Sequence, residues 1–230
     1  MILGVANGES YIGSDVPAIL KYTRDVYYIG NQEMARVRKG EITFYNLDGE
    51  EIEKELKTVE WDAEAAEKSG YEHFMIKEIH EQPKAVSDTL NSVIKDGMID
   101  LSEVGLSEEE IKEISQIYIV ACGSAYHVGV AAQYVMEDLA RIPVRVELAS
   151  EFRYRNPILD PKGLVVIISQ SGETADSLAA LRESKKQGVK TLGIVNVIGS
   201  SIAREADNVY YTLAGPEIAV ATTKRHTAHS

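Results

Sequence analysis

Residues 165–174 have the sequence VVIISQSGET, and this stretch decides the fold. Its four apolar, β-branched residues predict a strand buried on both faces, because a half-exposed strand would alternate apolar and polar side chains. The strand ends at hydroxyl, amide and glycine residues, and a helical pattern over residues 174–187 follows, with Ser171 expected to cap the helix. A buried strand, a polar turn and a helix form the repeating unit of a parallel α/β sheet.

The same rhythm extends through residues 116–212. An apolar strand at 117–121 is followed by Cys122-Gly123-Ser124-Ala125 and by a helical stretch, 126–140, with apolar residues on nearly every side, which predicts a buried helix. Further strands are expected at 144–148, 192–195 and 209–212. We therefore predict an α/β fold with a five-stranded, parallel, doubly wound, flavodoxin-like sheet, and we assume for it the strand order 2-1-3-4-5.

This strand order brings two polar loops together at the switch point where such folds bind ligands. They are 122–125, after the first strand, and 169–172, after the third. Hydroxyls, glycine and a helix N-terminus favour an anion site, whereas plain helix caps are the simpler alternative. A nucleophile is disfavoured, because Ser169 occupies the position of the first glycine in G-x-S-x-G and no histidine is placed as its base.

Composition limits the partners. The 230-residue chain has a formal net charge of −12, which argues against nucleic acid and anionic membranes. No apolar run approaches the roughly 20 residues of a membrane helix, and the N-terminus has no signal-peptide pattern. With Cys122 as the single cysteine, we expect a reducing cytoplasm. No metal site or cofactor is predicted, and His226 and His229 are assigned to a disordered tail.

The region before the parallel sheet has two parts. Residues 1–60 predict antiparallel α+β structure, with a helix at 14–22 and a hairpin at Asp48-Gly49. Residues 61–115 are acidic and helical. We expect one helix at 73–81, ending before Pro83, another at 86–94, and a third that begins with a capping box from Ser107 to Glu110.

Four segments in order carry a family resemblance. YEHFMIKEIHEQP (71–83), ASEFRYR (149–155), SQSGETADSL (169–178) and GPEIAVATTK (215–224) together resemble the glutamine–fructose-6-phosphate aminotransferases (isomerising), or glucosamine-6-phosphate synthases. The resemblance implies that 1–60 is the end of an N-terminal-nucleophile glutaminase domain and that 61–115 is an interdomain helical linker. It implies a first sugar isomerase (SIS) domain at 116–224 and a non-native or disordered tail at 225–230.

The resemblance also implies site residues and partners. The sugar-phosphate contacts it implies are Cys122, Gly123, Ser124, Ser169, Gln170, Ser171, Thr174, Val220 and Thr222. The family has Thr-Ser where this chain has Ser124-Ala125, so one hydroxyl is missing. Fructose 6-phosphate and glucosamine 6-phosphate are the implied ligands, and a cytoplasmic homodimer is the implied assembly.

No catalytic residue is assigned. The family's glutaminase cysteine has no counterpart before Cys122, and its isomerase acid and base groups lie beyond the first SIS domain. We therefore expect an internal fragment that is inactive alone and binds sugar phosphate weakly. One alternative is a non-catalytic SIS module that senses a sugar phosphate, which residues 1–60 argue against. Another is a complete small isomerase that uses Glu173 or His127 as base.

Overall fold

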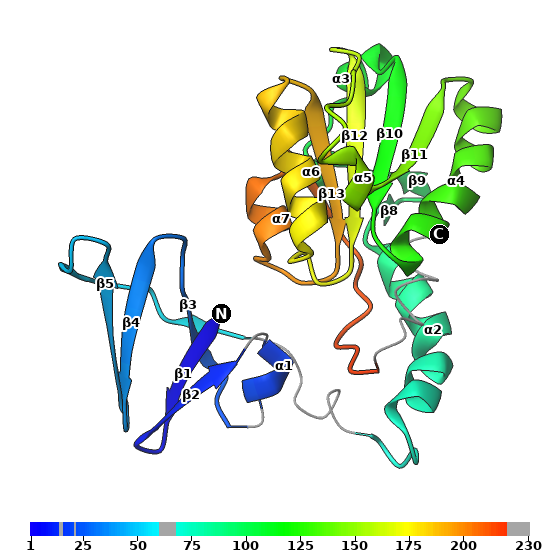
Figure 1. The fold of residues 1–230 in the computed structure, drawn as a ribbon. Coiled ribbons are helices and arrows are strands. Elements are labelled where there is room, and N and C mark those ends of the chain that lie inside the picture. Colours follow the sequence, from blue (N-terminus) through cyan, green and yellow to red (C-terminus); the bar gives the residue numbers. More distant parts are fainter. Residues whose placement is uncertain (14–15, 21, 60–67, 220–230) are drawn as a thin grey trace. The chain divides into compact units, whose positions relative to one another are not determined.

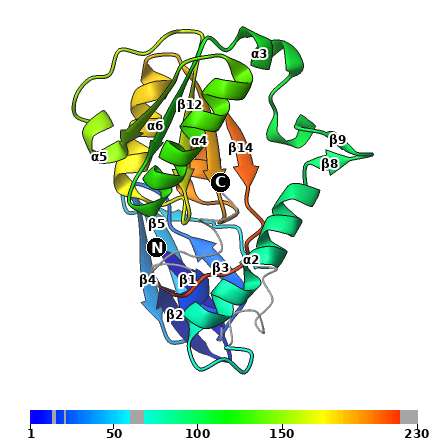
Figure 2. The ribbon, with the colours of Figure 1, turned by 90° about the vertical axis from the view of Figure 1, so that its right-hand side faces the viewer.

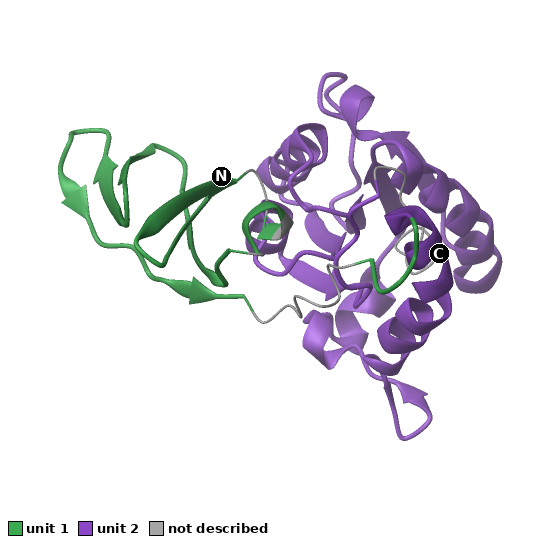
Figure 3. Ribbon diagram, turned by 90° about the horizontal axis from the view of Figure 1, so that it is seen from below, with its two compact units in different colours: residues 1–72 green, residues 73–230 purple. Residues whose placement is uncertain are grey.

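The computed structural model describes residues 1–13, 16–20, 22–59 and 68–219. The chain divides into two compact units, Met1–Glu72 and His73–Ser230, which are coloured separately in Figure 3. The predicted parallel sheet and both polar loops belong to the second unit.

The first unit is antiparallel, as predicted. One sheet has the order β2-β1-β3-β7 and a second has the order β4-β5-β6. The turn Asp48-Gly49 joins β5 to β6, as expected, and Asn7-Gly8, both with positive φ, joins β1 to an unpredicted strand β2. The elements are β1 (Ile2–Ala6), β2 (Glu9–Gly13), α1 (Val16–Ile19), β3 (Asp25–Tyr28), β4 (Glu33–Arg38), β5 (Glu41–Asn46), β6 (Glu51–Ile52) and β7 (Lys57–Thr58).

The second unit begins with helix α2 and a small hairpin and continues into the parallel sheet (Figure 1). Its elements are α2 (Phe74–Asn91), β8 (Ile94–Lys95), β9 (Met98–Ile99), η2 (Ser102–Val104), α3 (Glu108–Glu113), β10 (Gln116–Ala121), α4 (Ser124–Ala140), β11 (Val144–Leu148), α5 (Ala149–Phe152), β12 (Gly163–Ser169), α6 (Ala175–Lys186), β13 (Lys190–Val195), α7 (Ser201–Glu205) and β14 (Asn208–Tyr211). Among the described residues, none of these helices is both long and apolar enough to cross a membrane.

Helix α2 corrects one prediction. It runs through Pro83 without a break, where two helices were expected (Figure 2). An interior proline removes a backbone hydrogen bond and costs about 3 kcal/mol. Contacts on both sides of Pro83 offset this cost, because the Glu78 carboxylate accepts the N–H of Ile218 at 2.6 Å and the Thr89 hydroxyl accepts that of Leu213 at 3.2 Å.

The sheet order is β11-β10-β12-β13-β14, which confirms the predicted 2-1-3-4-5 order, and every pair is parallel. Alternate residues of the central strands face two separate cores. Tyr118 and Val120 of β10 pack with α5, α6 and α7, whereas Ile117 and Ile119 pack with α4. Both faces of the sheet are therefore covered, which explains why its central strands are continuously apolar.

Helix α4 is less buried than expected. Val128 packs against the sheet and is buried, but Tyr134, Val135 and Leu139 are 69%, 58% and 79% exposed. The apolar residues surround this helix on nearly all sides, yet only one side meets the sheet. The prediction of a buried helix was wrong because it assumed a second layer, which the described residues do not provide over this face.

The capping box that opens α3 is confirmed and carries a pH prediction. Glu110 accepts the N–H of Ser107 at 2.9 Å, the Ser107 hydroxyl accepts the N–H of Glu110 at 3.2 Å, and Lys190 pairs with the same carboxylate. The ion pair with Lys190, followed by the Ser107 N–H, lowers the pKa of Glu110 from 4.5 to about 2.

A group with a lowered pKa stabilises the fold above its unfolded pKa, and the contribution is lost as the pH falls. We expect the difference in free energy of unfolding between wild type and Glu110→Gln to be largest near neutral pH. It should shrink as the pH falls from 4.5 toward 2. Urea titrations at pH 7 and pH 3 measure it, with Glu109→Gln as control. Equal differences at both pH values would contradict the assignment.

Candidate functional site: a pocket at the switch point of the sheet

A pocket of about 200 Å³ lies where the strand order reverses, between the carboxyl ends of β10 and β12. It is lined by Cys122, Gly123, Ser124, Ala125, Ile168, Ser169, Gln170, Ser171 and Thr174. Pockets for whole drug-sized ligands measure about 300–1,000 Å³. This pocket therefore suits a small polar group, such as a phosphate, better than a complete larger ligand.

Ser169 organises the second loop. Its side chain is buried, its hydroxyl oxygen accepts the N–H of Gly172 at 3.1 Å, and it shares a hydrogen bond with the Thr174 hydroxyl at 3.1 Å. Gly172 has a φ of +65°, a left-handed conformation that favours glycine. The turn is thus fixed by a buried hydroxyl at its start and by a glycine at its centre.

Two backbone carbonyl groups of this loop accept hydrogen bonds from residues outside the pocket. The backbone oxygen of Gln170 accepts the N–H of Asn196 at 3.3 Å, and the backbone oxygen of Gly172 accepts that of Ile202 at 3.0 Å. Both oxygens therefore point toward the segment after β13. A bound anion would be repelled by carbonyl oxygens, so their direction away from the pocket favours anion binding.

Two helices begin at the pocket without a side-chain cap. Helix α4 starts after Gly123, which has no side chain to cap it, and α6 starts after Thr174, whose side chain accepts no backbone N–H of its helix. The first N–H groups of a helix have no partner inside it, and they carry a partial positive charge. Here they lie at the pocket, where an anion would satisfy them.

The predicted cap at Ser171 was wrong. Helix α6 begins at Ala175, and its N-cap is Thr174, three residues after Ser171. The Ser171 hydroxyl oxygen instead accepts the N–H of Glu173 at 3.2 Å, inside the turn. The positive φ of Gly172 extends the turn, which a cap prediction from residue type alone does not include.

The one carboxylate in the first turn of α6 is paired. Asp176 would oppose an anion at this helix terminus, and the Arg153 guanidinium donates to it at 2.6 Å. This pair raises the pKa of Arg153. Arg153, the first of the two arginines in the ASEFRYR segment, therefore compensates the charge of Asp176 at the edge of the site.

Cys122 contributes a half-buried thiol to the pocket. The hydroxyl of Ser177, on the buried face of α6, donates to its sulfur at 3.8 Å. No group of three or more His, Cys, Asp or Glu side chains that could hold a metal occurs in the part of the chain that the structure describes.

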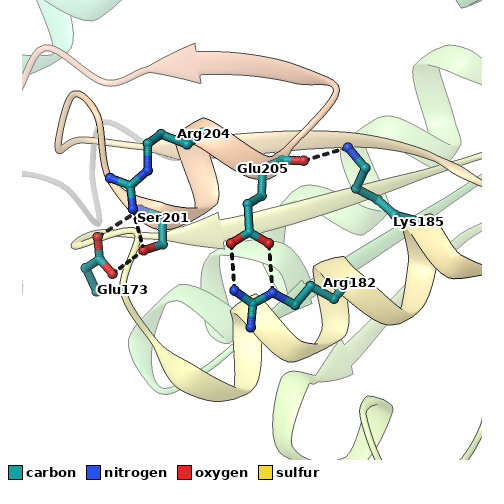
Figure 4. Close-up of polar contacts among 6 residues, drawn as sticks. All are labelled: Glu173, Arg182, Lys185, Ser201, Arg204 and Glu205. Carbon is teal, nitrogen blue, oxygen red and sulfur yellow. Dashed lines mark hydrogen bonds and ion pairs between the residues drawn. The ribbon is translucent and has the colours of Figure 1, made fainter. Parts of the chain in front are cut away.

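Glu173 and His127, the bases considered above, lie outside the pocket lining. Figure 4 shows the Glu173 carboxylate directed at the start of α7, where it accepts the N–H and hydroxyl of Ser201 at 2.8 and 2.7 Å. Nearby, Arg182 of α6 binds Glu205 of α7 through two hydrogen bonds of 2.7 and 2.6 Å. Glu173 thus fastens the pocket loop to α7, which weakens the interpretation as a complete small isomerase.

The structure brings seven of the nine predicted contact residues to one pocket, and Ala125 and Ile168 complete its lining. Val220 and Thr222 lie outside the described residues. Sequence reasoning missed Asn196, whose backbone N–H donates to the backbone oxygen of Gln170 in the second loop. An asparagine directly after a strand is common in turns, so its residue type alone gave no signal.

Comparisons with known proteins agree with the fold and with the family resemblance. A glutamine–fructose-6-phosphate aminotransferase (isomerizing) of Caldanaerobacter subterraneus subsp. tengcongensis is 56% identical over 228 residues, which are 99% of this chain and 38% of that protein. The Mycobacterium leprae enzyme of the same name is 50% identical, over 97% of this chain and 36% of its own length. The chain thus spans well under half the length of these relatives, and the resemblance found in its sequence is confirmed.

Solved structures give the same result for the fold. The C-terminal domain of glucosamine-fructose-6-phosphate aminotransferase from Francisella tularensis superposes with a TM-score of 0.68 at 48% identity, over 71% of this chain and 46% of that one. Tagatose-6-phosphate ketose/aldose isomerase from Escherichia coli, at 17% identity, shares the fold with a TM-score of 0.59, over 69% of this chain and 45% of that one. Residues 110–229 match the SIS domain model, and the chain therefore belongs to the SIS domain family.

Proposed function

We propose that the pocket binds the phosphate group of fructose 6-phosphate or glucosamine 6-phosphate. The observation that carries this proposal is the meeting of two helix N-termini, both without side-chain caps, at a pocket lined by hydroxyls. Several relatives are named as aminotransferases that act with fructose 6-phosphate. The remainder of the sugar would extend out of this small, open pocket.

The chemistry of the lining supports an anion bound by neutral groups. The lining residues include no carboxylate and no lysine or arginine, within the residues that the structure describes. The hydroxyls of Ser124, Ser171 and Thr174 and the thiol of Cys122 are available as donors, in addition to the helix N–H groups. Such donors hold a phosphate in a chain with a net charge of −12 without a basic patch.

We further propose that the chain is part of a glutamine–fructose-6-phosphate aminotransferase. In this proposal residues 1–60 belong to a glutaminase domain, 61–115 link it to the synthase half, and 116–224 are the first SIS domain. In this proposal the glutaminase nucleophile and the isomerase acid and base belong to other parts of such an enzyme, and the 230-residue chain alone binds sugar phosphate without turnover. A cytoplasmic homodimer is proposed from the resemblance alone.

Calorimetric titration of the 230-residue protein tests the ligand. We expect saturable binding of fructose 6-phosphate, weaker binding of inorganic phosphate, and none of fructose. Incubation with fructose 6-phosphate and glutamine should yield no glucosamine 6-phosphate. Equal affinities for fructose and its phosphate would refute the phosphate site, and product formation would refute the assignment of an inactive part.

Ser169→Ala tests the pocket loop. The substitution removes the acceptor of the Gly172 N–H, and a buried donor left unsatisfied costs about 1–3 kcal/mol. Because 1.4 kcal/mol is a factor of ten, we expect affinity for fructose 6-phosphate to fall about 10-fold or more. Ser184→Ala is the matched control, since Ser184 is equally buried but donates to Ala180 within α6. Unchanged affinity in Ser169→Ala, with the fold intact by circular dichroism, would exclude this loop as the binding element.

A further inference from the structure

Asn196 is the first residue after β13 and lies next to the pocket loop, residues 169–174. It is 6% exposed and does not line the pocket. Its backbone N–H donates to the oxygen of Gln170 at 3.3 Å, which places it in direct contact with the loop proposed to hold the phosphate. A buried amide side chain at this position needs partners of its own.

The side chain of Asn196 finds these partners in the segment after β14. Its oxygen accepts the N–H of Ala214 at 3.0 Å and the hydroxyl of Thr212 at 3.4 Å, and its nitrogen donates to the oxygen of Gly215 at 2.9 Å. These are three of the four hydrogen bonds that an amide side chain can make. One residue thus joins the pocket loop, through its backbone, to a second segment, through its side chain.

The segment 212–219 contains no helix or strand, so side chains must fix it. Thr89 accepts the N–H of Leu213, and Glu78 accepts the N–H groups of Ile218 and Ala219. Glu78 is 2% exposed and comes from α2, so the segment is held between that helix and Asn196.

We propose that Asn196 is a positioning residue that couples the pocket loop, residues 169–174, to the segment 212–219 and, through that segment, to helix α2. This inference rests on the proposed function of the pocket. An asparagine is required because the contacts to Ala214 and Gly215 need an acceptor and a donor on one planar group. Aspartate lacks the donor, and alanine lacks both, so that alanine leaves the N–H of the buried residue Ala214 without its acceptor.

Asn196→Ala should weaken binding of fructose 6-phosphate by about tenfold, because the buried Ala214 N–H loses its acceptor, a cost of about the 1.4 kcal/mol that this factor represents. Asn208→Ala is the matched control. Asn208 is also a buried asparagine with a side-chain bond to a backbone oxygen, that of Val104. It begins β14, at the edge of the sheet opposite the pocket, and its loss should leave the affinity within about twofold of wild type once the fold is verified.

Amide hydrogen exchange in the ligand-free protein provides a readout that does not depend on the ligand. Asn196→Ala should accelerate exchange at Ala214, whose acceptor is lost, and also at Gly172, which Asn196 does not touch. Asn208→Ala should change neither amide. Accelerated exchange at Ala214 alone, with unchanged affinity, would show that Asn196 only anchors its own segment and would overturn the coupling.

The two proposals fail in different ways. If the wild type does not bind fructose 6-phosphate, the proposed function fails, and the exchange at Gly172 still decides whether Asn196 supports the loop. If the wild type binds and Asn196→Ala binds equally well, the positioning role is wrong. Should the alanine variant not fold, Asn196→Asp retains the acceptor for Ala214 and loses the donor to Gly215. It is then measured in the same way and judged by the same outcomes.

Discussion

Gly172→Ala is expected to abolish sugar-phosphate binding and to destabilise the second unit by about 2–5 kcal/mol. Two costs combine. A side chain at a φ of +65° costs about 1–2 kcal/mol, and a clash in a packed site adds about 1–3 kcal/mol. A β-carbon built on Gly172 would lie 2.0 Å from the Ser200 hydroxyl oxygen and 2.5 Å from the Ser200 β-carbon, so the turn has to move.

Thermal and urea unfolding measure the loss of stability, and calorimetry with fructose 6-phosphate measures the loss of binding. Gly188→Ala is the matched control, because Gly188 has a φ of +75° and no atom within 4 Å of the added carbon. The free energy of unfolding of Gly188→Ala should fall only by the conformational cost of about 1–2 kcal/mol, and the variant should bind fructose 6-phosphate normally. Ser200→Gly in the Gly172→Ala background should recover part of the stability. A Gly172→Ala protein that binds like wild type would show that the shape of this turn is not needed.

Phe152→Ala should destabilise the second unit by about 3–5 kcal/mol, the range for removing a buried phenylalanine. Phe152 is fully buried at the end of α5, in the core shared by β10, β12 and α6. It belongs to the ASEFRYR segment that carries the family resemblance. Urea unfolding should show a lower midpoint with a single transition for this unit.

Two further variants separate packing from other causes. Phe152→Leu refills most of the space and should cost less than the alanine variant. Ile158→Ala removes an apolar side chain that is 87% exposed in the same connection, and it should change stability by no more than about 0.5 kcal/mol. If Phe152→Ala were as mild as Ile158→Ala, the core position of α5 would be wrong.

Much of the second unit follows from local patterns in the sequence. Apolar runs that alternate with helical stretches predict a parallel sheet with right-handed connections, and the strand order 2-1-3-4-5 was assumed because it is common in doubly wound folds. From that order follows the meeting of the loops after Ala121 and Ser169. Both steps use only the period of apolar residues and the general geometry of parallel sheets.

The features that were missed depend on partners far along the chain. The continuity of α2 through Pro83 requires hydrogen bonds between Glu78 and residues 140 positions later, which no local pattern encodes. The role of Asn196 likewise depends on Gln170 and Ala214, which lie on other elements. The exposed face of α4 was mispredicted for the same reason, because apolar periodicity does not tell how many layers cover a helix.

The absence of charged side chains from the described lining of the pocket has a consequence for how binding responds to its surroundings. Sites that hold phosphate with lysine or arginine weaken as salt screens their charges. In the proposed phosphate site the attraction would come from the backbone dipoles of α4 and α6, which act within the first turn of each helix and are also screened by salt. Salt equally screens the repulsion between an anionic ligand and a chain with a net charge of −12, so we expect affinity to fall less steeply with ionic strength than at a site built from lysine or arginine.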